Sequence, residues 1–109
     1  MDAKILEKIK ERIATNPYVN FLGIHFTKIE DGLVEAHMPL RDEQRQYSGV
    51  THGGVLAALA DTIAGFAAYT MTPLDKDVLT AELKISFLRA AWGYELIARG
   101  FVIKPGRRL

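Results

Sequence analysis

The sequence predicts an α+β fold in which an antiparallel β-sheet packs on one long, buried helix. Residues 55–71 are apolar on nearly every helical face and carry a single charge, Asp61, which is typical of a helix buried all round. Residues 23–30 and 33–39 are strand-like and meet at the turn dipeptide Asp31-Gly32, which predicts a β-hairpin. Residues 78–88 alternate apolar and polar side chains without a break, as a half-buried strand does.

Composition limits the classes of protein that this chain can join. With 109 residues, 49% hydrophobic and 25% charged, residues 1–109 are expected to form a single domain. The net charge of +1 disfavours a binder of nucleic acid or of membrane surfaces. The absence of cysteine excludes a disulfide scaffold, thiol catalysis and cysteine-based metal sites. No signal-peptide pattern begins the chain, so we expect a cytoplasmic protein. Residues 53–74 are long enough to span a membrane, but the charge in mid-span and the strand-like segments that follow argue against it.

The first element is an amphipathic helix over residues 2–15. Asp2 is suited to cap its N-terminus, and Asn16-Pro17 ends it because the residue before proline disfavours the α region. One apolar stripe runs along it at helical spacing and consists of Ile5, Leu6, Ile9 and Ile13. We expect this helix to cover the sheet or the entrance of the site.

The hairpin strands should each bury one face. That face carries Ile24 and Phe26 on the first strand and Val34, Ala36 and Met38 on the second. His25 and His37 lie on these strands without metal-ligand spacing, so we expect them to face solvent or to be hydrogen-bonded, and no metal site is predicted.

The rest of the chain alternates loops and strands. Residues 41–51 form a polar loop whose Arg41 and Arg45 could meet phosphates, although solvated charges are the commoner case. On residues 78–88, the apolar positions (Leu79, Ala81, Leu83, Ile85 and Phe87) should pack on the helix while the polar positions (Thr80, Glu82, Lys84 and Ser86) meet water. Residues 90–93 turn the chain, with Trp92 as a packing or lid residue, and residues 94–103 form another strand. Residues 104–106 turn again, and 107–109 would begin a further strand.

Asp61 and the glycine turn before its helix are the candidate functional groups. A carboxylate in an apolar helix must be partnered, reached by water or protonated, because a dry, unpaired charge costs several kcal/mol or more. At the start of the same helix, Gly53 and Gly54 follow His52. The first backbone N–H groups of a helix have no internal partners and sit at the positive end of its dipole. They suit a carbonyl oxygen that gains negative charge, or a phosphate.

The spacing of these groups has a consequence for assembly. Gly53 and Asp61 are eight residues apart, about 12 Å along a helix. One reacting carbon cannot lie within ~3 Å of both. If both groups serve one substrate, Asp61 must come from a second copy whose helix runs antiparallel, which a two-fold dimer provides twice.

The His52-Gly53-Gly54 turn, followed by Leu59-Ala60-Asp61 in an apolar helix, resembles the hotdog-fold acyl-CoA thioesterases of the phenylacetate-degradation type. The resemblance covers roughly residues 18–109. It includes residues 21–24, which would lead into the first strand, and residues 87–89 at the end of a later strand.

The resemblance implies a role for each site residue. The Gly53 N–H would polarise the thioester carbonyl, and Asp61 of the partner subunit would act as nucleophile or as general base on water. His52 would position the thioester. Gln46 stands where relatives carry an asparagine, and Thr80 stands where relatives orient the attacking water, although alternation places Thr80 on the water-facing side. Gly54 and Val55 would contact substrate, and the cations available for coenzyme A phosphates are Lys84, Arg89, Arg107 and Arg108.

The implied architecture is a hotdog fold: an antiparallel sheet wrapped around a long central helix, with an N-terminal amphipathic helix, assembled as a homodimer or as a homotetramer (a dimer of dimers). No metal or redox cofactor is implied, because coenzyme A arrives with the substrate. Relatives continue for one or two further strands. We therefore expect the sheet to be C-terminally incomplete, either because the chain is a fragment or because a neighbouring copy completes it.

Three other functions remain open. A hydroxyacyl-thioester dehydratase would use His52 and a partner's Asp61 as acid and base. A non-enzymatic acyl-CoA binder or sensor would keep the pocket but would not catalyse hydrolysis. An assembly domain would keep Asp61 as an interface residue. A triad of Ser48, His52 and Asp61 is disfavoured because Asp61 lies more than two helical turns from the histidine.

Overall fold

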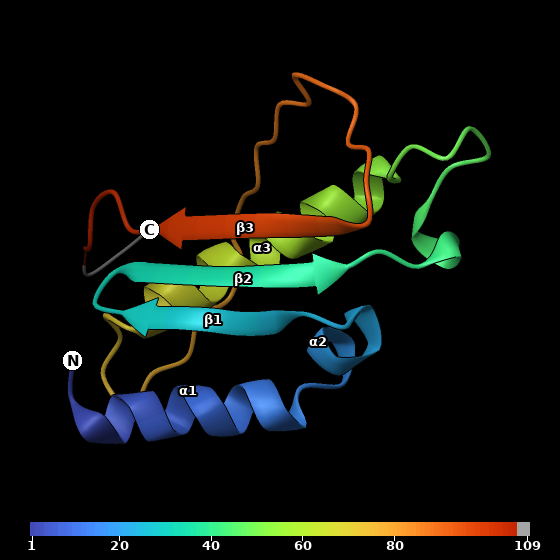
Figure 1. Cartoon of the computed structure of the whole chain (residues 1–109). Coiled ribbons are helices and arrows are strands. Elements are labelled where there is room, and N and C mark those ends of the chain that lie inside the picture. The colour runs from blue at the N-terminus through green and yellow to red at the C-terminus, as the bar shows by residue number, and fades with distance from the viewer. Residues whose placement is uncertain (107–109) are drawn as a thin grey trace.

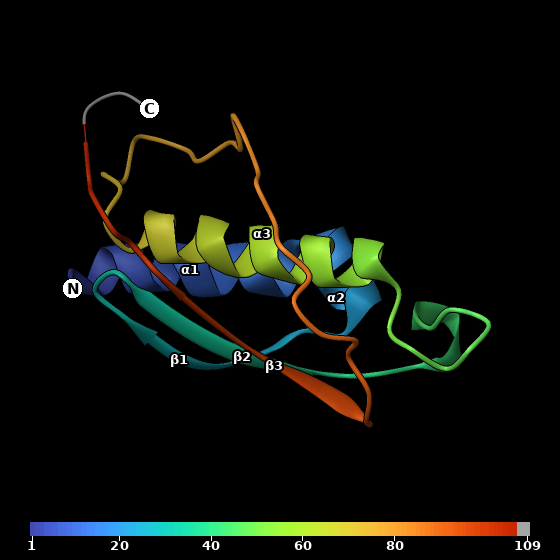
Figure 2. The same ribbon diagram turned by 90° about the horizontal axis from the view of Figure 1, so that it is seen from above.

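The computed structural model describes residues 1–106 and shows a three-stranded sheet with a long helix across one face (Figure 1). The elements in chain order are α1 (Ala3–Thr15), α2 (Pro17–Leu22), β1 (His25–Glu30), β2 (Leu33–Pro39), the 3₁₀ turn η1 (Asp42–Gln44), α3 (Gly53–Tyr69) and β3 (Glu95–Phe101). The sheet order is β1-β2-β3 and both pairings are antiparallel. Figure 2 shows α1 beyond the β1 edge, in the same layer as α3. The predicted α+β class is confirmed.

Helix α1 follows the sequence prediction closely. The Asp2 carboxylate accepts a hydrogen bond from the Lys4 N–H at 2.8 Å, which satisfies one of the free donors at the helix start. Ile9 is buried on its inner side, and the helix ends at Asn16 as predicted.

The short helix α2 was not predicted, although residues 21–24 do lead into β1 as expected. Asn16 both ends α1 and caps α2, because its side chain accepts from the N–H groups of Tyr18 and Val19. Pro17 occupies the first helical turn, where its missing N–H costs nothing. Gly23 closes α2 with φ of 79°, a conformation that favours glycine.

The predicted β-hairpin is confirmed. Strands β1 and β2 pair antiparallel around Asp31-Gly32, and Gly32 takes φ of 69° in the turn. Val34, Ala36 and Met38 of β2 are buried at 0–1% exposure, as predicted for one face. His25 and His37 pair across the two strands, with ring centroids 5.1 Å apart.

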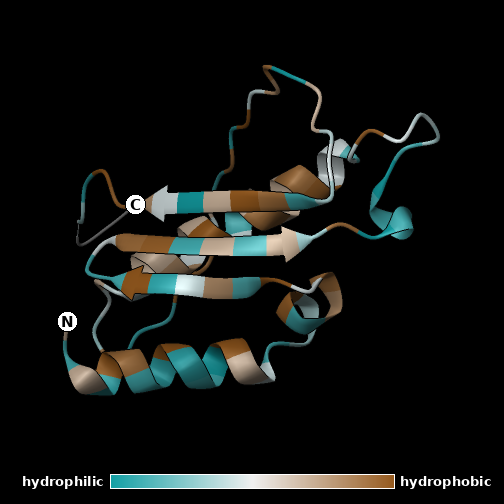
Figure 3. Ribbon diagram, viewed as in Figure 1, coloured by the Kyte–Doolittle hydropathy of each residue, from teal (hydrophilic) through white to brown (hydrophobic). Residues whose placement is uncertain are grey.

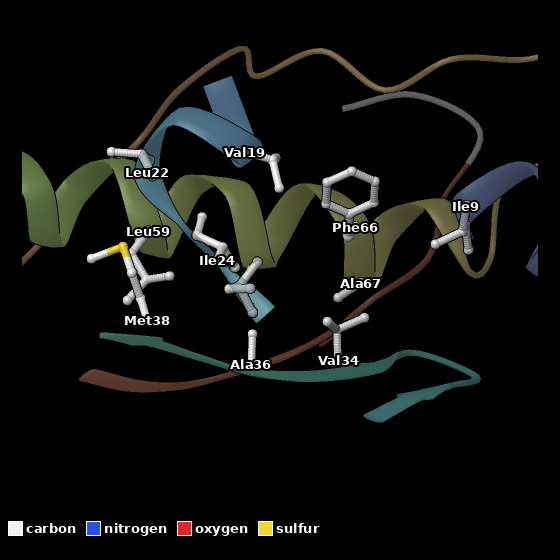
Figure 4. Packing of buried hydrophobic residues seen from close by; sticks show 11 residues of the cluster. Ile9, Val19, Leu22, Ile24, Val34, Ala36, Met38, Leu59, Phe66 and Ala67 are labelled. Carbon is white, nitrogen blue, oxygen red and sulfur yellow. The ribbon is translucent and has the colours of Figure 1, made fainter. Parts of the chain in front are cut away.

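The core lies between β2 and one face of α3. Side chains from β2 point toward α3 in Figure 4, where they meet Leu59, Phe66 and Ala67. Ile63 of the same helix face is 1% exposed. Each large apolar side chain buried in this way contributes roughly 1.5–3 kcal/mol, so this contact holds α3 against the sheet.

The prediction that α3 is buried all round is wrong for this chain. Ala60 and Ala64 are exposed, because the three strands cover one side of the helix. Between this part of α3 and β3 lies an apolar cavity of about 460 Å³. Contacts within residues 1–106 therefore bury only part of the apolar surface of α3.

The predicted strand over residues 78–88, called the 78–88 segment below, is not a strand in the structure. The segment runs extended without strand pairing to any residue of 1–106, and it passes on the side of α3 away from the sheet (Figure 2). Its apolar side packs on the helix only in part: Phe87 lies against Gly53 at the start of α3, whereas Leu79 is 92% exposed. A strand requires hydrogen bonds from a neighbouring backbone, and no described segment lies where it could supply them.

The remaining predictions concern loops and the last strand. The predicted strand 94–103 is present as β3, whereas the predicted strand at 107–109 lies outside the described residues. The loop that carries η1 is hydrophilic and projects from one end of the sheet (Figure 3). Trp92 is exposed and packs near Gly49 of that loop.

Candidate active site

The turn before α3 is held by His52. Its Nδ1 accepts a hydrogen bond from the Gly54 N–H at 2.8 Å, and its own N–H donates to the Gln44 carbonyl at 2.9 Å. Because an amide nitrogen can only donate, Nδ1 of His52 is the acceptor, and the neutral ring carries its proton on Nε2. His52 therefore caps the helix and keeps an N–H directed elsewhere. The N–H of Gly54, predicted to contact substrate, is already engaged by this cap.

Gly53 is the first residue of α3, and its N–H has no hydrogen-bond partner among residues 1–106. It sits at the positive end of the helix dipole. A Cβ at this position would lie 3.5 Å from the ring of Phe87, so the 78–88 segment closes over the turn. Gly53 lines a cavity of about 440 Å³ that Gln46 and Arg89 also line. The free Gly53 N–H therefore lies in one cavity with Gln46 and Arg89, two residues that the sequence analysis names as candidate site residues.

Asp61 lies two turns further along α3 and is half-buried. Its Oδ1 accepts a hydrogen bond from the Thr80 hydroxyl at 2.6 Å. The carboxylate opens onto a cavity of about 220 Å³, whose lining includes Asn16, Thr62 and Tyr69. The sequence analysis requires that this carboxylate have a partner or reach water. Thr80 is its hydrogen-bond partner, and the open cavity gives it access to water.

Thr80 reaches Asp61 although strict alternation placed it on the water-facing side. The 78–88 segment is not a regular strand, so its side chains do not keep to two opposite faces.

A single chain does not bring the two groups together. Gly53 and Asp61 line different cavities, as expected from their separation along one helix. The remaining predicted contacts are scattered. Val55 is half-buried, and its N–H donates to the His52 carbonyl at 3.0 Å. Lys84 is exposed and lines neither cavity.

The arginines of the polar loop have structural partners. The Arg41 guanidinium donates to the Phe21 carbonyl at 2.6 Å and lies over the Phe21 ring. Arg45 donates to the carbonyls of Gly49 and Gly93, at 3.0 and 2.7 Å. These two side chains tie the loop to its surroundings. Arg107 and Arg108 lie outside the described residues.

Sequence reasoning missed three contributors to the two cavities. The sequence predicts Asn16 only as a helix end, yet it lines the cavity of Asp61 together with Tyr69, whose hydroxyl donates to Asp77 at 2.9 Å. The sequence predicts that Phe87 packs on the helix but not that it does so over Gly53, where it also lines the cavity. These placements depend on how distant segments meet, and only the Asn16-Pro17 pair left a signal in the sequence.

The described part of the chain offers neither a membrane span nor a metal-binding cluster. No helix within residues 1–106 is long and apolar enough to cross a membrane. Over the same range, no group of three or more His, Cys, Asp or Glu side chains is arranged to hold a metal ion.

Comparisons with known proteins give a consistent family. The thioesterase superfamily model matches residues 48–109, more than half of the chain. The proofreading thioesterase EntH of Klebsiella pneumoniae subsp. pneumoniae is 40% identical over 68% of this chain, which spans about half (54%) of that relative's length.

Solved structures agree. A thioesterase family protein from Silicibacter pomeroyi superposes with a TM-score of 0.91 at 32% identity, over 94% of this chain and 76% of that one. The PaaI protein from the phenylacetic acid degradation operon of Escherichia coli superposes with a TM-score of 0.85 over 95% of this chain and 74% of that one, and at 22% identity this shows a shared fold. The helix that begins at the His52 turn lies within the matched family region. The chain belongs to the thioesterase superfamily and has its hotdog fold.

Proposed function

We propose that this protein hydrolyses an acyl-CoA thioester to the free acid and coenzyme A, in a homodimer or a dimer of dimers. Asp61 of one subunit and the Gly53 N–H of the other would act on one thioester. The observation that carries the proposal is the hydrogen bond from Thr80 to Asp61 at the mouth of a cavity.

That hydrogen bond suits the activation of water. The Thr80 hydroxyl donates its hydrogen bond to Asp61 Oδ1, so its oxygen is free to accept a hydrogen bond from a water molecule. A water held between the Thr80 oxygen and the carboxylate can lose a proton to Asp61 as it attacks. General-base catalysis of this kind contributes about 10²–10⁴-fold in rate.

The reaction then balances without a metal or redox cofactor. Asp61 takes a proton from water, and the resulting hydroxide adds to the thioester carbon while the Gly53 N–H stabilises the negative oxygen. The carbon–sulfur bond breaks, and the departing thiolate takes the proton from Asp61. Direct attack by Asp61, followed by hydrolysis of an anhydride, uses the same two groups.

The cavity at Gly53 supports the choice of a coenzyme A ester. Arg89 lines it and is exposed, so it can meet a phosphate at the cavity edge. Gln46 lines the same cavity and can donate from its side-chain amide to the thioester carbonyl. His52 keeps its Nε2 proton available to position the ester, a geometry that suits a donor better than a base.

The direct test is release of free thiol from a panel of acyl-CoAs, followed with a thiol reagent. We expect turnover by the natural chain and a loss of about 10³-fold in kcat/KM for Asp61→Asn, which keeps the shape of the side chain and removes the base. Asp75→Asn is the matched control, because Asp75 is exposed on the loop after α3 and should retain full activity.

Other outcomes point to other functions. Tight binding of acyl-CoA with no thiol release would indicate a binder or sensor. Hydration of an enoyl-CoA, read by absorbance, would indicate a dehydratase. Full thiol release by Asp61→Asn would contradict the assigned role of this carboxylate.

A further inference from the structure

We propose that the side-chain amide of Asn16 holds the attacking water in the cavity of Asp61, together with Asp61 and Thr80. Asn16 lies at the junction of α1 and α2, far from both of these residues in the sequence. The inference rests on the proposed function and extends it, because it assigns the contacts of the water that takes part in that reaction.

The orientation of the Asn16 amide is fixed by the start of α2. Its Oδ1 accepts hydrogen bonds from the N–H groups of Tyr18 and Val19, both at 3.0 Å. Because a backbone N–H can only donate, the atom that faces α2 is the oxygen, and the other arm of the amide carries the two N–H groups of Nδ2. Asn16 is half-buried, and its Nδ2 donates to no atom of residues 1–106. The side chain is therefore a held donor without a partner.

This donor belongs to the cavity beside Asp61. Among the described residues, Asn16 is the only one that lines the cavity from outside α3 and the 78–88 segment. Two hydroxyls of the lining already donate elsewhere, that of Thr80 to Asp61 and that of Tyr69 to the loop after α3. Asn16 thus adds a free donor to the carboxylate and the hydroxyl oxygen that the other two elements supply.

Contacts around Asn16 hold the α1–α2 junction beside α3. One turn earlier, Arg12 in the last turn of α1 forms an ion pair with Asp77 at 3.3 Å, and Lys8 lies 3.9 Å from the same carboxylate. Tyr69, the last residue of α3, donates to Asp77 as well. Asp77 therefore links the end of α1 to the end of α3, two helices that lie in one layer (Figure 2). None of the three charged groups lines the cavity of the proposed water.

A water molecule with these three partners is oriented for attack. It donates one hydrogen to Asp61 and the other to the Thr80 oxygen, and it accepts a hydrogen bond from Asn16 Nδ2, which leaves one lone pair free. A cavity of about 220 Å³ has room for it, because one water occupies about 30 Å³ and a buried water makes about three hydrogen bonds. The free lone pair forms the bond to the thioester carbon while the proton of the breaking O–H bond passes to Asp61.

The Asn16 donor assists the step in which the water loses its proton. The oxygen becomes hydroxide-like as Asp61 takes the proton, and an N–H that is already aimed at it stabilises this charge without reorganisation. One such hydrogen bond corresponds to about tenfold in rate. Because Nδ2 contacts the water and not the acyl-CoA, its contribution falls on kcat and leaves KM unchanged.

Asn16→Asp tests this role, because the two side chains have the same shape and cap a helix equally well. The variant loses the donor and places a second carboxylate in the cavity of Asp61. The N–H groups at the start of α2 keep the new carboxylate ionised, and a like charge nearby disfavours the ionised form of Asp61. We expect kcat to fall at least tenfold, with KM and the melting temperature unchanged. The acid limb of the pH profile of kcat should move to higher pH.

Asn16→Ser separates the lost donor from the added charge. Serine caps a helix about as well as asparagine does, but its shorter side chain leaves no free N–H in the cavity. We expect kcat to fall about tenfold, with the acid limb where the natural chain has it. Lys10→Gln is the control for net charge, because it lowers the charge by one unit, as Asn16→Asp does, at an exposed position of α1 that does not line the Asp61 cavity. It should behave as the natural chain does.

Titration of the Asp61 carboxyl by NMR, without substrate, tests the geometry alone. The midpoint should move to higher pH in Asn16→Asp and should stay unchanged in Asn16→Ser. An unmoved midpoint in Asn16→Asp would show that the two side chains do not face each other across one cavity, and it would overturn the proposal.

The kinetic outcomes separate this inference from the proposed function. Natural kcat in both Asn16 variants would overturn the role of Asn16, and so would a loss of activity that follows a loss of thermal stability, since the side chain would then act only as a helix cap. Both outcomes leave the proposed function in place, because the natural chain still releases thiol. If the natural chain releases no thiol from any acyl-CoA, the proposed function and the role of Asn16 are both overturned.

Discussion

Strand β2 and the 78–88 segment have similar sequence patterns and opposite fates. Both alternate apolar and polar residues, but β2 lies between two strands and its apolar side chains Val34, Ala36 and Met38 are at most 1% exposed. The 78–88 segment pairs with no strand of residues 1–106 and leaves Leu79 in solvent. The difference shows that an alternating sequence predicts which residues share a face. Whether the segment forms a strand depends on a neighbouring strand to which its backbone can hydrogen-bond.

The less packed segment is also the one that meets the functional groups. Thr80 bonds Asp61 and Phe87 covers Gly53, so the segment touches both ends of the candidate site. Elements that take part in binding are commonly drawn from the less stable parts of a fold. The sheet holds α3 in place through the buried core, and the 78–88 segment contacts the two candidate site residues of that helix, Gly53 and Asp61.

The largest contrast should appear in amide hydrogen exchange. In dilute protein kept monomeric, we expect the β2 amides to be slowed at least ~10³-fold relative to those of residues 78–88, because only β2 is hydrogen-bonded in a sheet. Strong protection of the segment in the monomer would break the comparison.

Side-chain truncation should separate the two regions by several kcal/mol. Ile63→Ala removes a side chain that is 1% exposed and should lower the free energy of unfolding by about 2–5 kcal/mol. Leu79→Ala, on a side chain that is 92% exposed, should change it by less than about 0.5 kcal/mol in the monomer. Denaturant unfolding at low protein concentration measures both, and equal losses would contradict the assignment of the core.

Replacing each of two glycines by alanine should change the free energy of unfolding in opposite directions. A Cβ at Gly100 of β3 would lie 2.8 Å from Ile63 Cγ2 and 3.2 Å from the Ile63 carbonyl oxygen, so Gly100→Ala should cost about 1–3 kcal/mol by pushing α3 off the sheet. Gly65 on α3 has nothing within 4 Å of the added atom, so Gly65→Ala should stabilise the helix by roughly 0.5–1 kcal/mol. Thermal unfolding of the two variants beside the natural chain gives both signs, and a stabilising Gly100→Ala would refute the close contact between α3 and β3.

The smallest effect should come from the link between the two regions. Lys8 of α1 donates from Nζ to the carbonyls of Leu74 and Lys76 at 2.8 and 2.7 Å, which anchors the chain just before the 78–88 segment. Lys8→Met should cost about 1 kcal/mol in stability and speed proteolysis of residues 74–80. Lys4→Met, an exposed position on the same helix, is the control and should leave both unchanged. Unchanged cleavage in Lys8→Met would show that this anchor does not restrain the segment.

Local signals predicted much of the fold. The Asp2 cap, the Asn16-Pro17 end of α1, the Asp31-Gly32 hairpin and the start of α3 after His52 are each encoded within a few residues. Helix α2 was missed because the Asn16 cap and Pro17 were read as the end of one helix and not as the beginning of the next.

For the site, the sequence by itself determined which residue types stand at which spacing: a glycine at the start of an apolar helix and one carboxylate eight residues later. It also determined that one helix cannot bring both groups to one atom, because the rise per residue is set by backbone geometry. The tertiary structure decided that Thr80 partners Asp61, that Phe87 covers Gly53, that one side of α3 stays open and that the 78–88 segment lacks a neighbouring strand. These features depend on contacts between segments far apart in the chain, and periodicity within a segment carries no information about which other segment it will meet.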